Sequence, residues 1–404
     1  MQFPRFMAAT AALAMASAVN PAHAADAGNG YNPKISLILN SSFAHYSSAA
    51  PADMPGFLLG DETGLTDSGL SLGETELAAE ANIDDQVHGW AALSVAPEGG
   101  IKVEEAYVNS LALPDGFALK LGRFFSDIGY QNHQHAHAWD FIDAPLVYRA
   151  MLGGQLGDDG LQARWIAPTD LLVEVGAEAL RGAAFPGGGE KRNGINNGLT
   201  GYLHVGGDAG SGGSWRVGLS HLHSKSDARE TGDPVHTQFT GKGELSILDL
   251  VYKWAPDGNP SVTNFTSQAE FFYRKENGEL VYDPDGADAI NTGPIGSSYR
   301  GHQQGFYVQA VYQFMPRWRV GTRYDRLSAG NQLALATPGA TLENLADRSH
   351  DPQRVSLMTD FSNSEFSRVR LQYNRDESRP GGAVDNQVFV QFIFSMGSHP
   401  AHQF

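Results

Sequence analysis

The amino-acid sequence predicts an all-β fold, an antiparallel transmembrane β-barrel of about 16 strands with short periplasmic turns and long extracellular loops. The first observation behind this prediction is a series of short stretches in which apolar and polar residues alternate. The second is that tight Pro, Gly and Asp turns alternate with long connections rich in Gly, Asp and Asn. This rhythm is typical of a membrane barrel, because one rim needs only turns and the other carries loops.

Residues 1–24 have the features of a cleavable export signal. Arg5 provides a positive start, residues 7–19 form an apolar run rich in Ala, and Ala22-His23-Ala24 is a small-x-small cleavage site. The apolar run is too short to span a bilayer, although an uncleaved N-terminal membrane anchor is the alternative interpretation. After cleavage, residues 25–33 are expected to form a short N-terminal periplasmic segment.

The composition limits the function classes. The 404-residue chain has a formal net charge of −17, which argues against nucleic acid as a partner because phosphates attract Lys and Arg. The sequence contains no cysteine, so disulfide and thiol chemistry is excluded. After the signal, no apolar stretch approaches the roughly 18 residues of a transmembrane helix. A mean hydropathy of −0.29 fits a barrel in which every second residue faces a wet interior.

The barrel itself is predicted over residues 34–397, and residues 398–404 form a C-terminal tail. Strands that run upward, away from the periplasm, are predicted at 34–42, 88–96, 116–125, 171–181, 215–223, 265–275, 318–327 and 366–375. Strands that run downward are predicted at 74–83, 101–111, 161–167, 199–205, 246–255, 305–314, 355–361 and 387–394.

The connections divide into two kinds. Short turns follow the downward strands, where Asp, Asn and Pro favour bends, at 84–85, 114–115, 168–170, 315–317 and 363–364. Long loops follow the upward strands at 47–73, 126–160, 182–198, 224–243, 276–304 and 328–354, with the short segment 97–100 as an exception. A soluble β-sandwich would not separate short and long connections so consistently.

Several predicted strands have one apolar and one polar face. Val320 and Tyr324 alternate with Arg319 and Arg323, so the first pair is expected to face lipid and the second the lumen. The strands at 101–111 and 116–125 alternate poorly, and their faces are not assigned. Amphipathic rings collect at membrane boundaries, and the short-turn rim is predicted to carry a girdle of Trp90, Trp165, Trp215, Trp254 and Trp318.

The assigned faces put charges of both signs in the lumen, which a barrel of this size leaves as an aqueous channel. A row of arginines opposite acidic groups makes a transverse field that orients polar solutes and filters ions. The alternative is that these charges only form salt bridges and keep the lumen solvated. The predicted pore-lining residues are Arg319, Arg323, Arg368 and Arg370 on one wall and Glu74, Glu76, Glu80, Glu174 and Glu178 on the other.

The third connection, residues 126–160, is called loop 3 and is the densest candidate site. It carries His133, His135 and His137 at alternate positions, with Asp140 shortly after them. Imidazole nitrogens and carboxylate oxygens together suit Zn²⁺ or a similar divalent ion. In the alternative interpretation, loop 3 is a polar loop whose histidines bond to backbone and water. We predict that loop 3 folds into the barrel and constricts it.

Catalytic signatures are scarce. The sequence has no Gly-x-Ser-x-Gly elbow and no His-Glu-x-x-His helix, and no phosphate-binding Gly loop follows a strand and opens a helix. Paired histidines at His221 and His223 and at His399 and His402 are weaker metal candidates. The sequence therefore predicts a protein that is not an enzyme.

Specific segments carry a family resemblance over nearly the whole chain after the signal. They are residues 122–125 (GRFF), 128–130 (IGY), 133–141, 143–145 (DAP), 158–160 (DDG) and 167–170 (APTD), with a tail ending at Phe404. In its layout of 16 strands with a long third loop, the chain resembles Gram-negative porins, especially the phosphate-selective porin O/P-like group. It is most similar to the barrels labelled zinc-regulated outer-membrane porins or TonB-dependent receptors. The first strand follows the signal closely, so we expect no plug domain, and the mixed lumen charge departs from the basic rows of phosphate porins.

The resemblance implies an outer-membrane porin through which small polar or ionic solutes diffuse, with a preference for zinc or another divalent metal as an added hypothesis. No cofactor is required, and Zn²⁺ is a candidate ligand or transported ion. The implied partners are outer-membrane lipid and lipopolysaccharide, the barrel assembly machinery and further copies of the chain in a homotrimer. The alternatives are an outer-membrane barrel enzyme of the phospholipase or protease type, and a plugless structural or adhesive barrel.

Overall fold

The computed structural model describes residues 32–49, 53–60, 65–73, 75–95, 99–189, 197–231, 236–283, 294–335, 345 and 350–397. Sixteen strands close into one antiparallel barrel, which confirms the predicted fold class. The first strand, β1 (Lys34–Tyr46), closes the ring by pairing with the last, β19 (Asp385–Gly397). The predicted signal, most of segment 25–33, the tail 398–404 with His399 and His402, and Glu74 lie outside the described residues.

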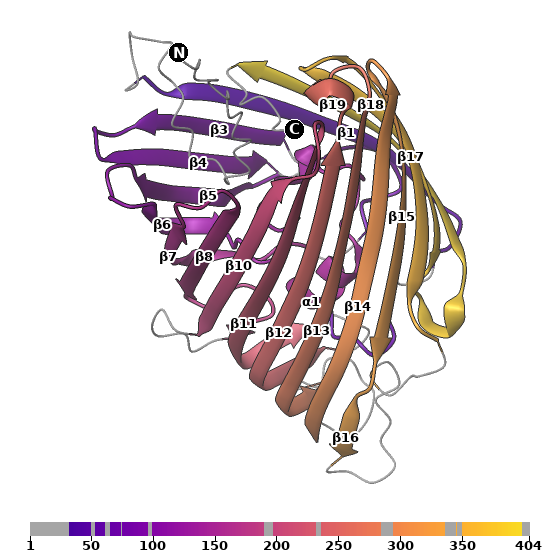
Figure 1. The fold of residues 1–404 in the computed structure, drawn as a ribbon. Coiled ribbons are helices and arrows are strands. Elements are labelled where there is room, and N and C mark those ends of the chain that lie inside the picture. Colours follow the sequence, from indigo (N-terminus) through magenta and orange to yellow (C-terminus); the bar gives the residue numbers. More distant parts are fainter. Residues whose placement is uncertain are drawn as a thin grey trace, which may run out of the picture.

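One wall of the barrel consists of short strands and is called the low wall (upper left in Figure 1). Its strands contain 8 to 10 residues each, close to the roughly 9–11 residues that a tilted strand needs to cross a bilayer. They are β3 (Thr75–Asn82), β4 (Val87–Val95), β5 (Ile101–Ser110), β6 (Phe117–Phe125), β7 (Gly157–Ile166) and β8 (Leu172–Leu180).

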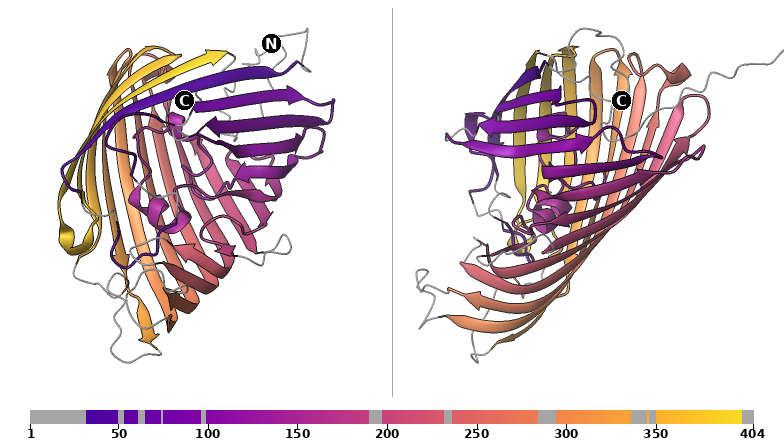
Figure 2. Two further views of the ribbon diagram at one scale, coloured as in Figure 1. Left: turned by 180° about the vertical axis from the view of Figure 1, so that it is seen from behind. Right: turned by 90° about the vertical axis from the view of Figure 1, so that its left-hand side faces the viewer.

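The opposite wall contains much longer strands (Figures 1 and 2). Strands β11 to β14 contain 18 to 21 residues and extend well past the membrane-crossing length at the long-loop rim. Most of the predicted loops 224–243 and 276–304 is therefore strand, which corrects the sequence-based assignment. The strands of this side are β10 (Gly198–Asp208), β11 (Gly213–Thr231), β12 (Thr237–Trp254), β13 (Asn264–Tyr282), β14 (Ile295–Met315), β15 (Trp318–Ala329), β17 (Gln353–Ser364) and β18 (Ser367–Glu377).

Shorter elements complete the described chain. The strand β2 (Gly69–Leu72) pairs with β1, β9 (Gly188–Gly189) with β11, and β16 (Gln332–Leu335) with β14. One α-helix, α1 (Leu146–Leu152), lies in loop 3, and 3-10 turns occur at η2 (Ala136–Ala138), η3 (Pro256–Gly258) and η4 (Pro380–Gly382). None of the described helices has the length and apolar character needed to cross a membrane.

The strand faces follow the predicted alternation. On β14, Val308 and Tyr312 are 45% and 40% exposed on the outside, whereas Gln309 is buried inside. The poor alternation of the strand at 101–111 has a local cause, a register shift in the β4–β5 pairing that inserts Glu104 as an extra residue. As a result, both Glu104 and Glu105 contact loop 3 inside the barrel.

A hydrophobic core lies inside the barrel rather than between layers. The helix α1 is entirely buried, and both ribbon views place it within the ring of strands (Figures 1 and 2). Around it pack apolar side chains of loop 3, of segment 53–60 and of the inner strand faces, among them Phe57, Leu222, Phe272 and Leu327. At this level apolar side chains pack the interior, so any solute path beside α1 is narrower than an empty barrel.

Candidate functional site: loop 3 inside the barrel

Loop 3 folds into the barrel. In the structure it ends at residue 156, because β7 begins at Gly157. Its two ends are joined by Asn132, whose Nδ2 donates to the carbonyls of Ser126 and Leu156 at 2.8 and 2.9 Å. The Leu156 amide donates back to Asn132 Oδ1 at 2.8 Å. One buried side chain thus satisfies backbone groups from both ends, and the loop is a closed unit that crosses the interior.

Glu270 on β13 holds the first half of loop 3. Its carboxylate accepts hydrogen bonds from the Tyr130 and Gln131 amides at 3.2 and 3.1 Å and from the Tyr148 hydroxyl at 2.9 Å. The turn that delivers these amides needs Gly129, which has a φ of +70°. A Cβ at that position would lie 2.4 Å from Glu270 Oε2, so only glycine allows this approach.

Asp143 holds the second half. Its carboxylate accepts from Arg323 Nη2 and Arg354 Nη1 at 2.7 Å each, and from Gln372 and Asn374 at 2.8 and 3.0 Å. Burial alone would raise the pKa of Asp143, but the Arg354 and Arg323 guanidiniums outweigh burial and hold that pKa well below its usual range. Every donor comes from β15, β17 or β18, so these strands and loop 3 form one polar network.

Most of the predicted arginine row is engaged with loop 3. Arg319 Nη1 lies 2.9 Å from Asp140 Oδ1, and Arg370 Nη2 donates to the Trp139 carbonyl at 2.7 Å. Arg319 also pairs with Asp360 at 2.6 Å. Arg368 differs, because its Nε and Nη1 are buried without a hydrogen-bond partner among the described residues. Arg319 and Arg323 are therefore engaged in salt bridges, as in the alternative interpretation, rather than being unpaired charges that line a pore.

The described glutamates of the other wall have separate partners. Glu178 accepts from the Asp127 amide at 3.0 Å and from Thr200 at 2.7 Å, and so anchors the start of loop 3. Glu80 lies 3.7 Å from both Lys34 and His88, and Glu174 lies 3.9 Å from His204. Glu76 instead faces the histidines of loop 3.

The structure brings together only part of the predicted metal set. Glu76, His135 and His137 each offer one ligand atom, and these atoms all lie within 4.8 Å of one another. His133 lies elsewhere, beside the Tyr130 ring, and Asp140 pairs with Arg319. The prediction of one site containing His133 and Asp140 is therefore wrong. The η2 turn instead brings His135 and His137 to the same side, where both contact Glu76 on β3.

The two histidines 133 and 135 have opposite electrostatic surroundings. Burial lowers the pKa of His133 to about 4, despite the attraction of Asp127. Burial would also lower the pKa of His135, but hydrogen bonds to Glu104, Glu105 and Glu76 raise it well above the usual value. The carboxylates around His135 thus attract positive charge strongly.

Sequence reasoning missed several residues of this region. Glu270 was readable as an inward charge on a predicted strand, since it lies between the apolar residues Ala269 and Phe271. Arg354 was missed because it falls at the end of the predicted loop 328–354, whereas the structure places it in β17. Glu104 and Glu105 were hidden by the irregular register of β5, which no period-two pattern reveals. The partners of Asp143 lie 180 and 211 residues away, so the pairings themselves have no local signal.

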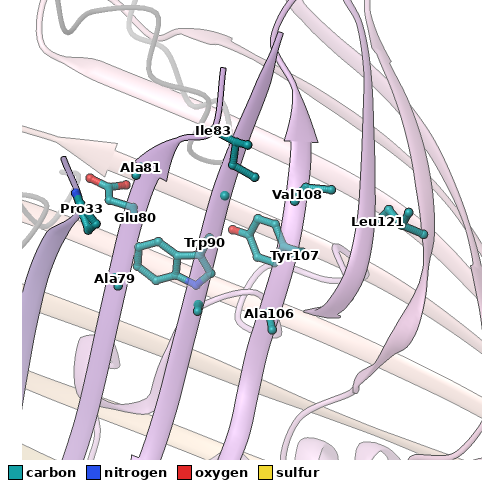
Figure 3. A pocket seen from close by; sticks show the side chains of 12 residues that line it. Pro33, Ala79, Glu80, Ala81, Ile83, Trp90, Ala106, Tyr107, Val108 and Leu121 are labelled. Carbon is teal, nitrogen blue, oxygen red and sulfur yellow. The ribbon is translucent and has the colours of Figure 1, made fainter. Parts of the chain in front are cut away.

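The outside of the low wall is separate from this site. A shallow depression there is lined by small and aliphatic side chains at positions alternating with the inward Glu80, Trp90 and Tyr107 (Figure 3). Trp90 itself donates to Glu105 inside the barrel at 3.1 Å, so it does not belong to the predicted girdle, whereas Trp254 and Trp318 are 38% and 37% exposed. The outward lining residues are Ala79, Ala81, Ile83, Gly89, Ala91, Ala106, Val108 and Leu121, and Pro33, Glu80, Trp90 and Tyr107 complete the lining.

A sequence relative defines the family of the chain. An uncharacterized protein of Aquifex aeolicus (strain VF5) is 31% identical over 404 aligned residues, which cover 92% of this chain and 80% of the relative. The chain belongs to the same family as this Aquifex protein. No protein-family model matches the chain.

Solved structures similar to this one are outer-membrane barrels. The trimer form of OmpT, an outer-membrane protein of Vibrio cholerae, has a TM-score of 0.53 at 11% identity, covering 90% of this chain and 99% of that one. The channel DcaP of Acinetobacter baumannii has a TM-score of 0.53 at 12% identity, covering 90% and 97%. OmpF of Salmonella typhi has a TM-score of 0.51 at 14% identity, covering 91% and 99%. At such identities the likeness establishes a shared porin-like barrel fold.

Proposed function

We propose that the protein is an outer-membrane porin through which small polar or ionic solutes diffuse. The observation that carries the proposal is the closed barrel with an apolar outside and a charged inside, into which loop 3 folds. Asp143 and Asp140 are each about one-fifth exposed, which supports access of water to the charged face of loop 3 beside the packed core. We infer that the protein resides in the outer membrane and that the predicted signal directs its export.

The solute class is proposed to include zinc or another divalent cation rather than phosphate. The Arg319 and Arg323 guanidiniums are ion-paired with aspartates, which reduces their capacity to bind a passing phosphate. On the other wall, carboxylates and imidazoles face each other at Glu76 and His135. This arrangement supports the resemblance to zinc-regulated porins over the resemblance to phosphate-selective porins. The proposed function includes no catalytic activity and requires no cofactor.

Partners follow from the same proposal. We infer that outer-membrane lipid and lipopolysaccharide surround the apolar belt and that the barrel assembly machinery inserts the chain. A homotrimer is proposed because a structurally similar barrel was solved as a trimer and because the low wall has small residues, such as Ala79 and Gly89, on its outside. Chemical cross-linking of the purified protein in detergent tests the trimer, and a monomer at all concentrations would contradict it.

Single-channel recording in a planar lipid bilayer tests the porin proposal. Purified protein is expected to give discrete steps of low conductance, because loop 3 and segment 53–60 fill part of the interior. A variant lacking residues 133–143 should give larger steps if loop 3 forms the constriction. If neither protein conducts after verified insertion, the channel function is overturned. Hydrolysis of phospholipid or peptide by the non-conducting protein would favour a barrel enzyme instead.

A further inference from the structure

A compact group of nitrogen and oxygen ligands joins loop 3 to the low wall. Glu76 Oε2 lies 3.1 Å from the Nδ1 atoms of both His135 and His137. The three side chains are only 9% to 14% exposed. Ligand atoms around a tetrahedral zinc ion, with bonds near 2.0–2.1 Å, lie about 3.3 Å apart. The observed separations from Glu76 therefore already approach those of a metal coordination shell.

The local fold of loop 3 presents the two imidazoles together. The turn η2 is closed by a hydrogen bond from the Ala138 amide to the His135 carbonyl at 2.9 Å. Trp139 Nε1 donates to the Gln134 carbonyl at 2.8 Å and fixes the exit of the turn. The rings of His135 and His137 lie 5.7 Å apart at a 31° tilt, both on the side of β3.

A second layer of contacts orients His135, and this is an independent observation pointing to a metal. Its Nε2 lies 2.9 Å from Glu105 Oε2. Glu105 is itself held by Trp90 Nε1 at 3.1 Å and by the Phe125 amide at 2.9 Å. A carboxylate that accepts the far N–H of a histidine is the usual support of metal-binding imidazoles, because it fixes the tautomer and ring orientation. Nδ1 of His135 is thereby the atom turned toward Glu76.

We propose that Glu76, His135 and His137 bind a divalent transition-metal cation inside the barrel. Two imidazoles and a carboxylate suit Zn²⁺ and its neighbours better than Mg²⁺ or Ca²⁺, which favour oxygen ligands. Glu104, whose Oε2 lies 3.2 Å from His135 Nδ1, adds negative charge beside the site. Because the ligands come from β3 and from loop 3, a bound ion fastens the loop to the low wall, opposite the strands that hold Asp143. The role of the ion in solute passage rests on the porin function proposed above.

The competing explanation is that a positively charged His135 simply bridges glutamates through ion pairs. The two explanations differ in a measurable property, since only the metal site binds a cation stoichiometrically and selectively. They also differ in the part played by His137, whose Nδ1 contacts Glu76. The metal site needs this imidazole as a ligand, whereas ion pairs between His135 and the glutamates do not require it.

Equilibrium dialysis of the full-length protein, purified in detergent without a histidine tag, tests the proposal with ZnCl₂ as the probe. We expect one tightly bound Zn²⁺ per chain that excess Mg²⁺ and Ca²⁺ do not displace. The variants Glu76→Gln, His135→Ala and His137→Ala should each lose this binding by 10-fold or more. Glu105→Gln, which changes the support of His135 and none of the three proposed ligands, should weaken binding by about 10–100-fold.

Matched controls are His133→Ala inside loop 3 and His221→Ala on the outside of β11, which should bind zinc like the wild type. Heat-dependent migration on gels verifies that each variant is a folded barrel. The proposal is overturned if the wild type binds no zinc, or if His133→Ala weakens binding as much as His135→Ala. Since dialysis does not depend on conductance, a protein that binds zinc but passes no current would retain this site and lose the porin function, and the converse result would do the opposite.

Discussion

Arg354 on β17 donates a 2.7 Å hydrogen bond to Asp143 in loop 3, across 211 residues of sequence. Arg354 is fully buried, and its other terminal nitrogen donates to the Ala144 carbonyl at 2.8 Å. Arg323 on β15 binds the same aspartate from the other side. A buried charge of this kind requires its partner, so the position of loop 3 and the ionisation of these arginines depend on each other.

Removing the charge of Asp143 should therefore release loop 3 without unfolding the barrel. Asp143→Asn removes the counter-ion that loop 3 supplies to the buried Arg323 and Arg354, which then pair only with Asp325 and other carboxylates of the barrel wall. Breaking a buried ion pair costs up to about 3–5 kcal/mol, and here the loss falls on the attachment of loop 3. Arg149 is the only Lys or Arg in residues 126–156 and is buried in α1, so trypsin cleavage after it reports release of the loop. We expect fast cleavage in the variant, slow cleavage in the wild type and larger conductance steps.

The matched control is Asp159→Asn. Asp159 also pairs with an arginine, Arg123, at 2.8 Å, but both side chains are about two-fifths exposed on the barrel wall. Exposed pairs contribute about 0–1 kcal/mol, so this variant should be cleaved as slowly as the wild type. Equal protection of Asp143→Asn and the wild type would show that Asp143 does not hold loop 3.

The same ion pair predicts a pH dependence. The pKa of Asp143 is lowered in the folded protein, so its contribution to stability is present above the pKa of the unfolded chain, about 4. It is lost as the pH falls toward the folded-state pKa. The difference in unfolding free energy between the wild type and Asp143→Asn should stay constant from about pH 8 to 5 and shrink below pH 4. Denaturant titrations in detergent measure it, and a difference that grows on acidification would contradict the assignment.

The sequence predicts the barrel well because its signal is local. Alternation at Val308 and Gln309, or at Val320 and Arg319, depends only on which side of one strand a residue occupies. All sixteen predicted strands correspond to strands of the barrel, and the errors lie in their lengths. Strands such as β12 continue past the bilayer, where no apolar belt marks them.

The site was predicted less completely because its pairings are not local. His135 and His137 were recognised from their spacing, and Glu76 from its inward face, but nothing in the sequence joins them. Asp140 was assigned to a metal because its true partner, Arg319, lies 179 residues away. The buried helix α1 was missed because its seven residues lie within a long loop, show no strand period and make only about two helical turns.

The apolar outer face makes a prediction about lipid. Leu248 is 43% exposed on the outside of β12, six residues from the rim tryptophan Trp254. Leu248→Arg should destabilise the folded barrel in lipid vesicles by about 2–4 kcal/mol, as arginine does near the bilayer midplane. Val262→Arg, at a 49% exposed position in the turn before β13, should change stability by less than about 1 kcal/mol. Equal effects of the two would show that this face does not contact lipid.

The approach of loop 3 to β13 predicts an unequal response of two glycines. Gly129 and Gly154 both have positive φ, +70° and +99°, so alanine at either position costs about 1–2 kcal/mol of backbone strain. A Cβ at Gly129 would in addition lie 2.4 Å from Glu270 Oε2, whereas a Cβ at Gly154 meets nothing within 4 Å. Gly129→Ala must therefore displace the loop or the carboxylate that holds it, and trypsin should cleave after Arg149 far faster in this variant than in Gly154→Ala. Similar cleavage rates would mean that Glu270 does not position the loop.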